Sequence, residues 1–176
     1  MIRKIILIIG ILALVLFMAV IGAAWYMGAF SSVDIKTEIR GPYNFICLEH
    51  VGAYHLIAAK IEKVRQYLDS KQIPYLHSAG MYFDDPAKVS EIELRSQGGY
   101  LIPDSVLVDI PFQFIKIKKR KTAVAAINAH PMIAPFKVYS AFHEWLENQN
   151  DSLNVVGAPL ELYLPSNRVE VEFPLE

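Results

Sequence analysis

The stretch YNFICLEHVGAYHLIAAKIEKVRQYL, residues 43–68, decides the fold because its hydrophobic pattern changes once. Its first part is an apolar run bounded by turn residues at Gly41-Pro42 and Gly52, which is typical of a β-strand. From Tyr54 onward the apolar side chains recur at helical spacing, opposite a face of charged residues. The stretch therefore predicts a strand that is followed directly by an amphipathic helix.

Working outward, residues 33–40 alternate apolar and polar side chains, as a half-buried strand does. After the helix come a strand HSAGMYF (77–83), a turn at 84–86 and a strand around EIELRS (91–96). The carboxyl-terminal half repeats this order, with a strand at 122–129, a helix at about 135–147, and strands at 158–164 and 168–175. The repeat period is about 80 residues, so that Tyr82 corresponds to Tyr163.

This duplication predicts an α+β fold built from two strand-helix-strand-strand modules, at about residues 37–110 and 112–176. Each module has one helix to cover about three strands. We therefore expect two sheets joined edge to edge around a pseudo-twofold axis, with both helices on one side.

The first 33 residues have a different character. No charged side chain occurs from Ile5 to Val33, and a helix needs about 20 apolar residues to cross a bilayer. A cleaved signal peptide is the alternative, since Arg3 and Lys4 form a basic start, but its apolar core is only about 7 to 15 residues long. We interpret residues 1–33 as one transmembrane anchor and residues 34–176 as the folded domain. Positive-inside counting places that domain outside the cytoplasm.

Composition excludes several classes of function. The chain has 17 basic and 18 acidic residues, so its charge gives no reason to expect a nucleic-acid partner. The basic run at 116–121 is interpreted as a solvated strand end and turn. Cys47 has no partner for an internal disulfide, and the five histidines lack metal-ligand spacing, so neither metal nor cofactor is expected. No nucleophile elbow, Walker loop or dinucleotide glycine pattern is present, and we assign no catalytic residue.

Strand alternation suggests a candidate site. If the leucines of LELYL (160–164) face the core beneath the helices, Glu161 and Tyr163 point to the opposite, concave face. The same rule sends Tyr82 outward to that face. A carboxylate between aromatic rings suits a cationic or amphipathic ligand. The alternative is that these are ordinary solvent-facing residues. Asp84-Asp85-Pro86 is interpreted as a structural turn. Trp145 is interpreted as a core residue in preference to a platform for a ligand.

Together these motifs resemble the GyrI-like (gyrase-inhibitor-like) small-molecule-binding domain. The resemblance covers about residues 37–176 and is carried by GPYNFICLEHVGAYHLI, GMYFDDP, WLENQN and GAPLELYLPSN. The order of an anchor and then this domain is similar to the testis-expressed ER-phagy receptor and its bacterial relatives. The receptor's autophagy role needs a long disordered tail that this sequence does not contain, so only the domain is carried over. The first module contains an H-x-G-x-Y pattern as His50, Gly52 and Tyr54. The second module departs from that pattern, because its equivalent residues read HPMIA (130–134).

The resemblance implies a ligand site. In multidrug-binding relatives a glutamate in a P-x-E-x-Y strand receives cationic drugs, and Pro159, Glu161 and Tyr163 match that pattern. We expect a membrane-anchored binding module that takes a small amphipathic or cationic molecule, or a partner protein, in a groove between the modules. Its expected ligand-binding residues are Glu161, Tyr163, Tyr82, Tyr54 and Trp145. The alternatives are a hydrolase of strained or electrophilic molecules that uses Glu161, and a peptide-docking scaffold without a pocket.

Overall fold

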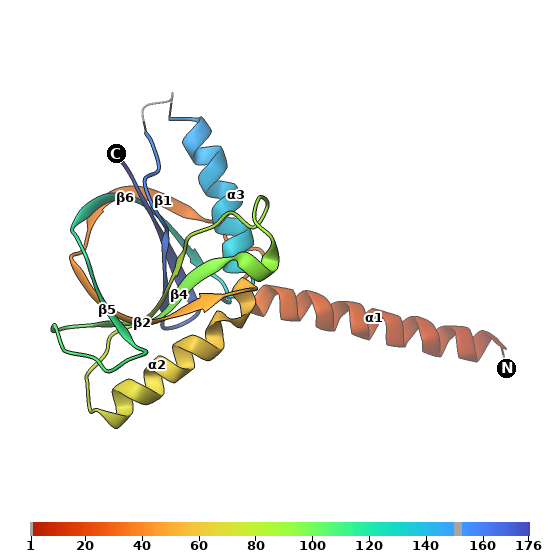
Figure 1. The fold of residues 1–176 in the computed structure, drawn as a ribbon. Helices are drawn as coiled ribbons and strands as arrows, with labels where there is room; N and C mark the ends of the chain where they lie inside the picture. The colour runs from red at the N-terminus through yellow and green to blue at the C-terminus, as the bar shows by residue number, and fades with distance from the viewer. Residues whose placement is uncertain (1, 150–152) are drawn as a thin grey trace.

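The computed structural model describes residues 2–149 and 153–176. Its most prominent feature is an amino-terminal helix, α1 (Ile2–Tyr26), which projects away from the folded domain (Figure 1). None of its residues is buried against the domain, and its most apolar window has a mean hydropathy of 3.2. By length and composition the helix is able to cross a membrane, and a signal sequence would meet the same description.

The rest of the described chain forms one sheet, two further α-helices and two short 3-10 turns. The helices are α2 (Ala58–Ser70), preceded by a 3-10 turn at Tyr54–Ile57, and α3 (Ala134–Glu147). The other 3-10 turn is Glu91–Glu93. The strands are β1 (Asp34–Arg40), β2 (Tyr43–Val51), β3 (Ser78–Tyr82), β4 (Arg95–Ile102), β5 (Gln113–Ile117), β6 (Arg120–Asn128), β7 (Leu160–Leu164) and β8 (Arg168–Pro174).

The sheet has the order β1-β6-β8-β7-β3-β4-β2-β5, and its strand pairs are antiparallel. It curls into a half-barrel (Figure 1). β2-α2-β3-β4 and β6-α3-β7-β8 are two copies of one module, and they meet where β3 pairs with β7. The predicted α+β fold, with duplicated modules and an apolar helix before them, is confirmed.

Both helices pack on the same, convex face of the sheet. Beneath α3 lie apolar side chains of β6 and β8, among them Ile127, Val171 and Phe173, and the Phe142 ring stacks on Phe173 at 3.6 Å between centroids. Ile46, Leu48 and Ile102 lie beneath α2 and pack against the apolar side chains of that helix. Gly98 of β4 is part of this contact, because a Cβ there would come within 2.8 Å of Ile57.

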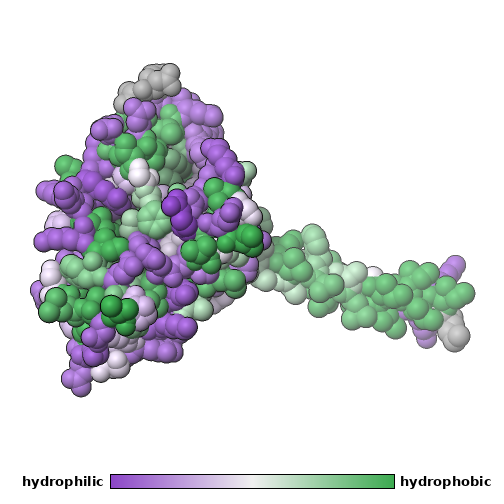
Figure 2. Space-filling view, viewed as in Figure 1, coloured by the Kyte–Doolittle hydropathy of each residue, from purple (hydrophilic) through white to green (hydrophobic). Residues whose placement is uncertain are grey.

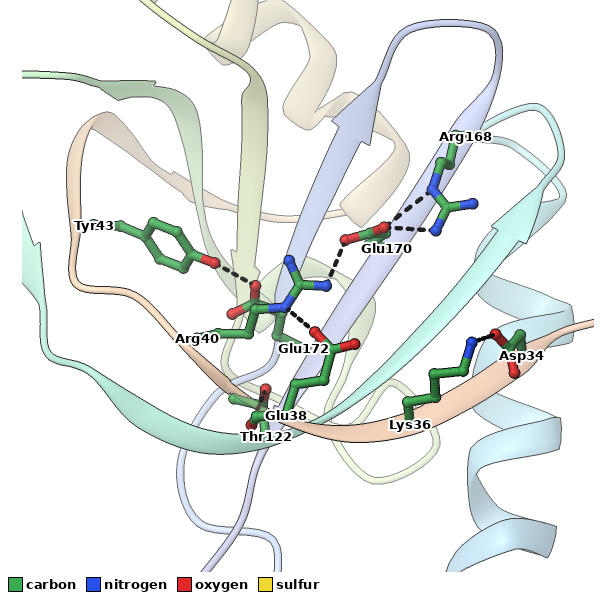
Figure 3. A network of polar contacts seen from close by, with 9 residues as sticks. All are labelled: Asp34, Lys36, Glu38, Arg40, Tyr43, Thr122, Arg168, Glu170 and Glu172. Atoms are coloured by element: carbon green, nitrogen blue, oxygen red, sulfur yellow. Dashed lines mark hydrogen bonds and ion pairs between the residues drawn. The ribbon is translucent and has the colours of Figure 1, made fainter.

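The concave face of the half-barrel has a core of its own. Its apolar half contains Phe45, Cys47, Leu160 and Leu162, and no residue of either helix belongs to it. Its other half is charged, as Figure 3 shows, with Glu170 and Glu172 among arginine and tyrosine side chains. The sheet is therefore buried on both faces.

One strand begins later than its sequence suggested. The segment EIELRS was expected to be a strand, but Glu91–Glu93 is a 3-10 turn and β4 runs from Arg95 through Gly98 and Gly99. Glycine is poor in strands, so propensity places the strand too early. Here the missing side chains are required by packing, because a Cβ on Gly99 would lie 1.9 Å from the Ile46 carbonyl oxygen.

Candidate functional site

The junction of the two modules places Glu161 directly opposite Gly80, its cross-strand partner in the β3–β7 pair. Glu161 and Gly80 are separated by the same number of residues as Tyr163 and Tyr82, so they are also equivalent positions of the duplication. The carboxylate thus stands beside the pseudo-twofold axis. The glycine leaves room for an aromatic ring, since a Cβ on Gly80 would come within 2.9 Å of the Tyr82 ring.

Glu161 is buried, with 3% of its surface exposed, and its partners are phenols. Tyr163 donates a hydrogen bond to Oε2 at 3.0 Å, and Tyr139 of α3 donates one to Oε1 at 3.2 Å. The Tyr82 and Tyr163 hydroxyls are 2.7 Å apart. Because Tyr163 uses its proton on Glu161, Tyr82 donates to Tyr163 when the carboxylate is ionised. We call Glu161, Tyr163, Tyr139, Tyr82 and Tyr54 the tyrosine cluster.

Tyr54 closes the cluster at its outer edge. Its ring meets the Tyr82 ring edge-on, with centroids 4.8 Å apart. Its hydroxyl donates to the Asp84 carbonyl at 2.7 Å and accepts the Asp84 amide at 3.0 Å. The Asp84 carboxylate is held by Arg95 at 2.7 Å, and Asp85 accepts the Ala87 amide, as expected for a turn. The Asp84 backbone therefore holds the Tyr54 hydroxyl, and the two carboxylates have structural partners of their own.

The electrostatics of Glu161 differ from those of the other two buried glutamates. Glu170 accepts hydrogen bonds from Arg40 and Arg168, and Glu172 accepts one from Tyr43 and lies in the field of Arg40 and Arg120. Within residues 2–149 and 153–176, no lysine, arginine or histidine forms an ion pair with Glu161. It is a buried acid without a counter-charge there.

Burial raises the pKa of Glu161 to about 7, and the hydrogen bonds from Tyr163 and Tyr139 offset only part of that rise. Burial also raises the pKa values of Tyr82, Tyr139 and Tyr163, so these phenols stay protonated at neutral pH. The cluster therefore combines one carboxyl that titrates near neutrality with hydroxyl groups that remain donors.

The structure brings Glu161, Tyr163, Tyr82 and Tyr54 together, as the sequence suggested, but on the other face of the sheet. These side chains lie on the convex face, and Glu161 is bonded to α3, whereas Leu160 and Leu162 point into the concave core. The expectation that the leucines would face the helices is wrong. That expectation assumed that one face of the sheet is covered by helices and the other is solvated. When both faces are buried, apolar residues do not identify the face that the helices cover.

Trp145, the fifth expected residue, lies further along α3 and stacks on Phe142 in the core beneath that helix. Sequence reasoning missed Tyr139, which lies on the face of α3 that packs on the sheet. It also missed Ser96, which is cross-strand from Tyr82 and buried, and whose hydroxyl has no hydrogen-bond partner in the described chain.

Glu161 is closed off from solvent in this structure, with 3% of its surface exposed, although Tyr54, Tyr139 and Tyr163 are half-buried. Hollows of about 490 and 240 Å³ occur elsewhere, one beside Glu38 and Arg120 and the other beside Ile73 and Val106. Access to Glu161 therefore requires the covering rings to move.

Comparison with known proteins gives a weak sequence relationship and a clear structural one. No protein-family profile matches the sequence. DNA gyrase inhibitor 2 of Dickeya dadantii (strain 3937) is 20% identical over 77 residues, which is 43% of this chain and 49% of that protein. The match thus spans about half the length of the relative.

Three solved structures have related folds at low identity. The first, a DNA complex of EcmrR, has a TM-score of 0.65 at 13% identity and covers 99% of this chain and 70% of that chain. SAV2435 bound to tetraphenylphosphonium has a TM-score of 0.57 at 13% identity and covers 81% and 94%. A hydrolase from Listeria innocua has a TM-score of 0.56 at 10% identity and covers 81% and 92%. At these identities the likeness shows a shared fold and no more.

Proposed function

We propose that this protein is a membrane-anchored binding module of the GyrI-like type, and that its tyrosine cluster receives a small amphipathic cation. The observation that carries the proposal is the burial of Glu161 with phenols as its hydrogen-bond partners. A buried carboxylate without a counter-ion is costly, and a bound cation would supply the missing charge. The cation ligand of SAV2435, which shares the fold, supports the same chemistry.

The surroundings of Glu161 fit a cation of low charge density. Four tyrosine rings offer polarisable faces, and cations stack favourably on such faces. Affinity comes mainly from burial of aromatic surface, and the carboxylate selects the sign of the ligand's charge. Binding needs the Tyr54 and Tyr82 rings to swing away from the carboxylate, so we expect it to proceed by opening of this cover.

In the same proposal α1 is a retained single-pass anchor. About 20 apolar residues are needed to span a bilayer and α1 has 25 residues, so Trp25 and Tyr26 fall where aromatic rings favour the interface. Arg3 and Lys4 at the start of α1 place that end in the cytoplasm by the positive-inside rule, so the domain lies outside the cytoplasm.

Titration of the full chain in lipid nanodiscs with two ions of the same shape tests the ligand class. Tetraphenylphosphonium is a cation and tetraphenylborate its anionic counterpart. We expect Glu161→Gln to weaken cation binding at least about tenfold, equivalent to about 1.4 kcal/mol, and not to weaken anion binding. Glu144→Gln, the same change at an exposed position on α3, should alter neither. Equal loss for both ions in Glu161→Gln would contradict the proposal.

A hydrolase is the second candidate, and one observation favours it. Glu161 has a pKa of about 7 and is hydrogen-bonded through Tyr163 to Tyr82, an arrangement able to exchange a proton with a reacting group. One structure with this fold is described as a hydrolase. Turnover of a strained electrophile such as an epoxide, lost in Glu161→Gln and retained in Glu144→Gln, would favour the enzyme over the binding module.

A further inference from the structure

The residues that follow α1 are fixed to the domain by hydrogen bonds to their backbone and side chains. The His130 amide donates to the Met27 carbonyl at 2.9 Å, and the Ser31 hydroxyl donates to the Asn128 carbonyl at 2.7 Å. Lys137 of α3 donates to the Ala29 carbonyl at 2.6 Å. The helix therefore ends on the segment that joins β6 to α3.

Gly28 shows how closely the two parts fit. It has a φ of +77°, and a Cβ there would lie 2.4 Å from the Asn128 carbonyl oxygen and 2.6 Å from the Ala129 Cα. These are backbone atoms, which cannot turn aside as a side chain does. With the Met27 hydrogen bond, contact with the domain begins at the first residue after α1, so no flexible linker separates α1 from the domain.

Large apolar side chains are exposed on both sides of this junction. On α1 and just after it, Trp25, Tyr26 and Phe30 are 73%, 81% and 65% exposed. On the domain, Met132 in the turn that leads into α3 and Phe136 in the first turn of α3 are 70% and 81% exposed. Figure 2 shows the hydrophobic surface of α1 where the helix leaves the domain.

We propose that this junction surface, formed by Trp25, Tyr26, Phe30, Met132 and Phe136, rests in the headgroup region of the bilayer that α1 enters. The inference rests on the proposed membrane anchoring of α1. If about 20 residues before Trp25 span the hydrocarbon, Trp25 and Tyr26 lie at the interface. The rigid contact at Gly28 then holds the start of α3 at nearly the same depth.

The bilayer is the occupant that the geometry favours, because hydrogen bonds tie the residues that follow the apolar helix α1 to the segment that carries Met132 and Phe136. Burial of Phe136 and Met132 among lipid removes their apolar surface from water, which is favourable. The Lys137 ammonium beside Ala29 adds a cation at headgroup level. The domain would thus sit on the membrane in a fixed orientation instead of swinging on a tether.

Tryptophan quenching by brominated lipid tests the depth of the domain. The full chain is reconstituted in phosphatidylcholine vesicles with acyl chains brominated near the glycerol. Trp145→Phe leaves Trp25 as a reporter of the anchor. Adding Trp25→Phe and Phe136→Trp moves the reporter to the start of α3. Leu107→Trp in the same background is the matched control, since Leu107 is fully exposed in the β4–β5 loop, on the side of the domain away from α1 (Figure 1).

We expect the reporter at 136 to be quenched at least half as strongly as Trp25, and the reporter at 107 not to be quenched. Adding Gly28→Val should reduce quenching at 136 without changing it at Trp25, with circular dichroism verifying the fold. Quenching at 136 no greater than at 107, while Trp25 is quenched, would overturn the proposal and leave the anchor intact. A blue-shifted, unquenched reporter at 136 would mean that protein covers the surface, which also overturns it. Absence of quenching at Trp25 would overturn the anchoring itself.

Discussion

At the scale of single residues, Glu161 is the costly group of this fold. Its carboxylate is buried beneath α3 with hydrogen bonds from Tyr139 and Tyr163, whereas Glu170, buried on the opposite face, is paired with Arg40 and Arg168. A protein gains no stability from an acid placed in this way. Sites that lower stability in this manner are often those that bind or react, since function needs the uncompensated charge.

This cost gives a stability prediction for Glu161→Gln. The pKa of Glu161 is about 7 in the folded protein against an ordinary value of 4.5, so folding favours the protonated acid. Stability contributed by that proton is present at pH 4.5 and below and is lost as the pH rises to about 7, at a total cost of about 3 kcal/mol. The uncharged glutamine avoids that cost. We expect the variant to be more stable than the wild type at pH 8 and similar to it at pH 4.5.

Urea unfolding of the full chain in nanodiscs at pH 4.5, 6 and 8 measures this difference, with Glu144→Gln as the exposed control. A wild-type protein whose stability relative to Glu161→Gln does not change with pH would show that the carboxylate is solvated or has found a counter-charge.

Residue identity was only partly predictable from sequence. Strand parity correctly grouped Glu161, Tyr163 and Tyr82, because they alternate with apolar residues on adjacent strands. Parity could not say which face carries the helices, since Leu160 and Leu162 are buried in the concave core. Tyr139 was missed because a tyrosine on an amphipathic helix has the same spacing as a core residue, and only the packing of α3 over β7 gives its hydroxyl an acid to bond.

At the scale of elements, the β3–β7 pair forms the site by setting a glycine opposite an acid. The Tyr82 ring occupies the space above Gly80, and from there its hydroxyl reaches Tyr163. The duplication alone predicts equal residues at equivalent positions. The pair departs from that symmetry at Gly80 and Glu161. The second module supplies the charge of Glu161, and the first supplies, at Gly80, the space that the Tyr82 ring occupies.

Gly80→Ala tests this division of roles. The new methyl group would come within 2.9 Å of the Tyr82 ring, which must shift and lose its bond to Tyr163. We expect a loss of about 1 to 3 kcal/mol in stability, as for overpacking in a core, and cation affinity reduced several-fold. Tyr82→Phe is the companion variant, because it removes the hydroxyl and leaves the ring in place. If Gly80→Ala binds tetraphenylphosphonium as the wild type does, the position of the Tyr82 ring is irrelevant to the site.

At the scale of the whole molecule, period and repeat predicted much of the architecture. The change of period at Gly52 and its counterpart near His130 located both helices, and the repeat gave the two modules. The curl of the sheet was not predictable, because it depends on how eight strands twist together and on which side chains fill the inner face. That curl buries Glu170 and Glu172 on the concave face, whereas α3 covers Glu161 on the convex face, so burial of an acid could not be deduced from its strand alone.

The assembled molecule should couple cation binding to proton release. A carboxyl with a pKa of about 7 is about half protonated at neutral pH, and only the ionised form attracts a cation. The affinity for tetraphenylphosphonium should therefore increase about tenfold per pH unit well below pH 7 and level off above about pH 8. In Glu161→Gln the affinity should be lower and independent of pH.

Calorimetric titration at pH 6.5 in two buffers of different ionisation enthalpy measures the protons released. We expect about 0.7 to 0.8 proton per cation bound for the wild type, from the fraction protonated at that pH, and none for Glu161→Gln. Because the phenols of Tyr82, Tyr139 and Tyr163 stay protonated throughout this range, they cannot supply the released proton. Binding of the cation without release would place it away from Glu161 and separate the ligand site from the tyrosine cluster.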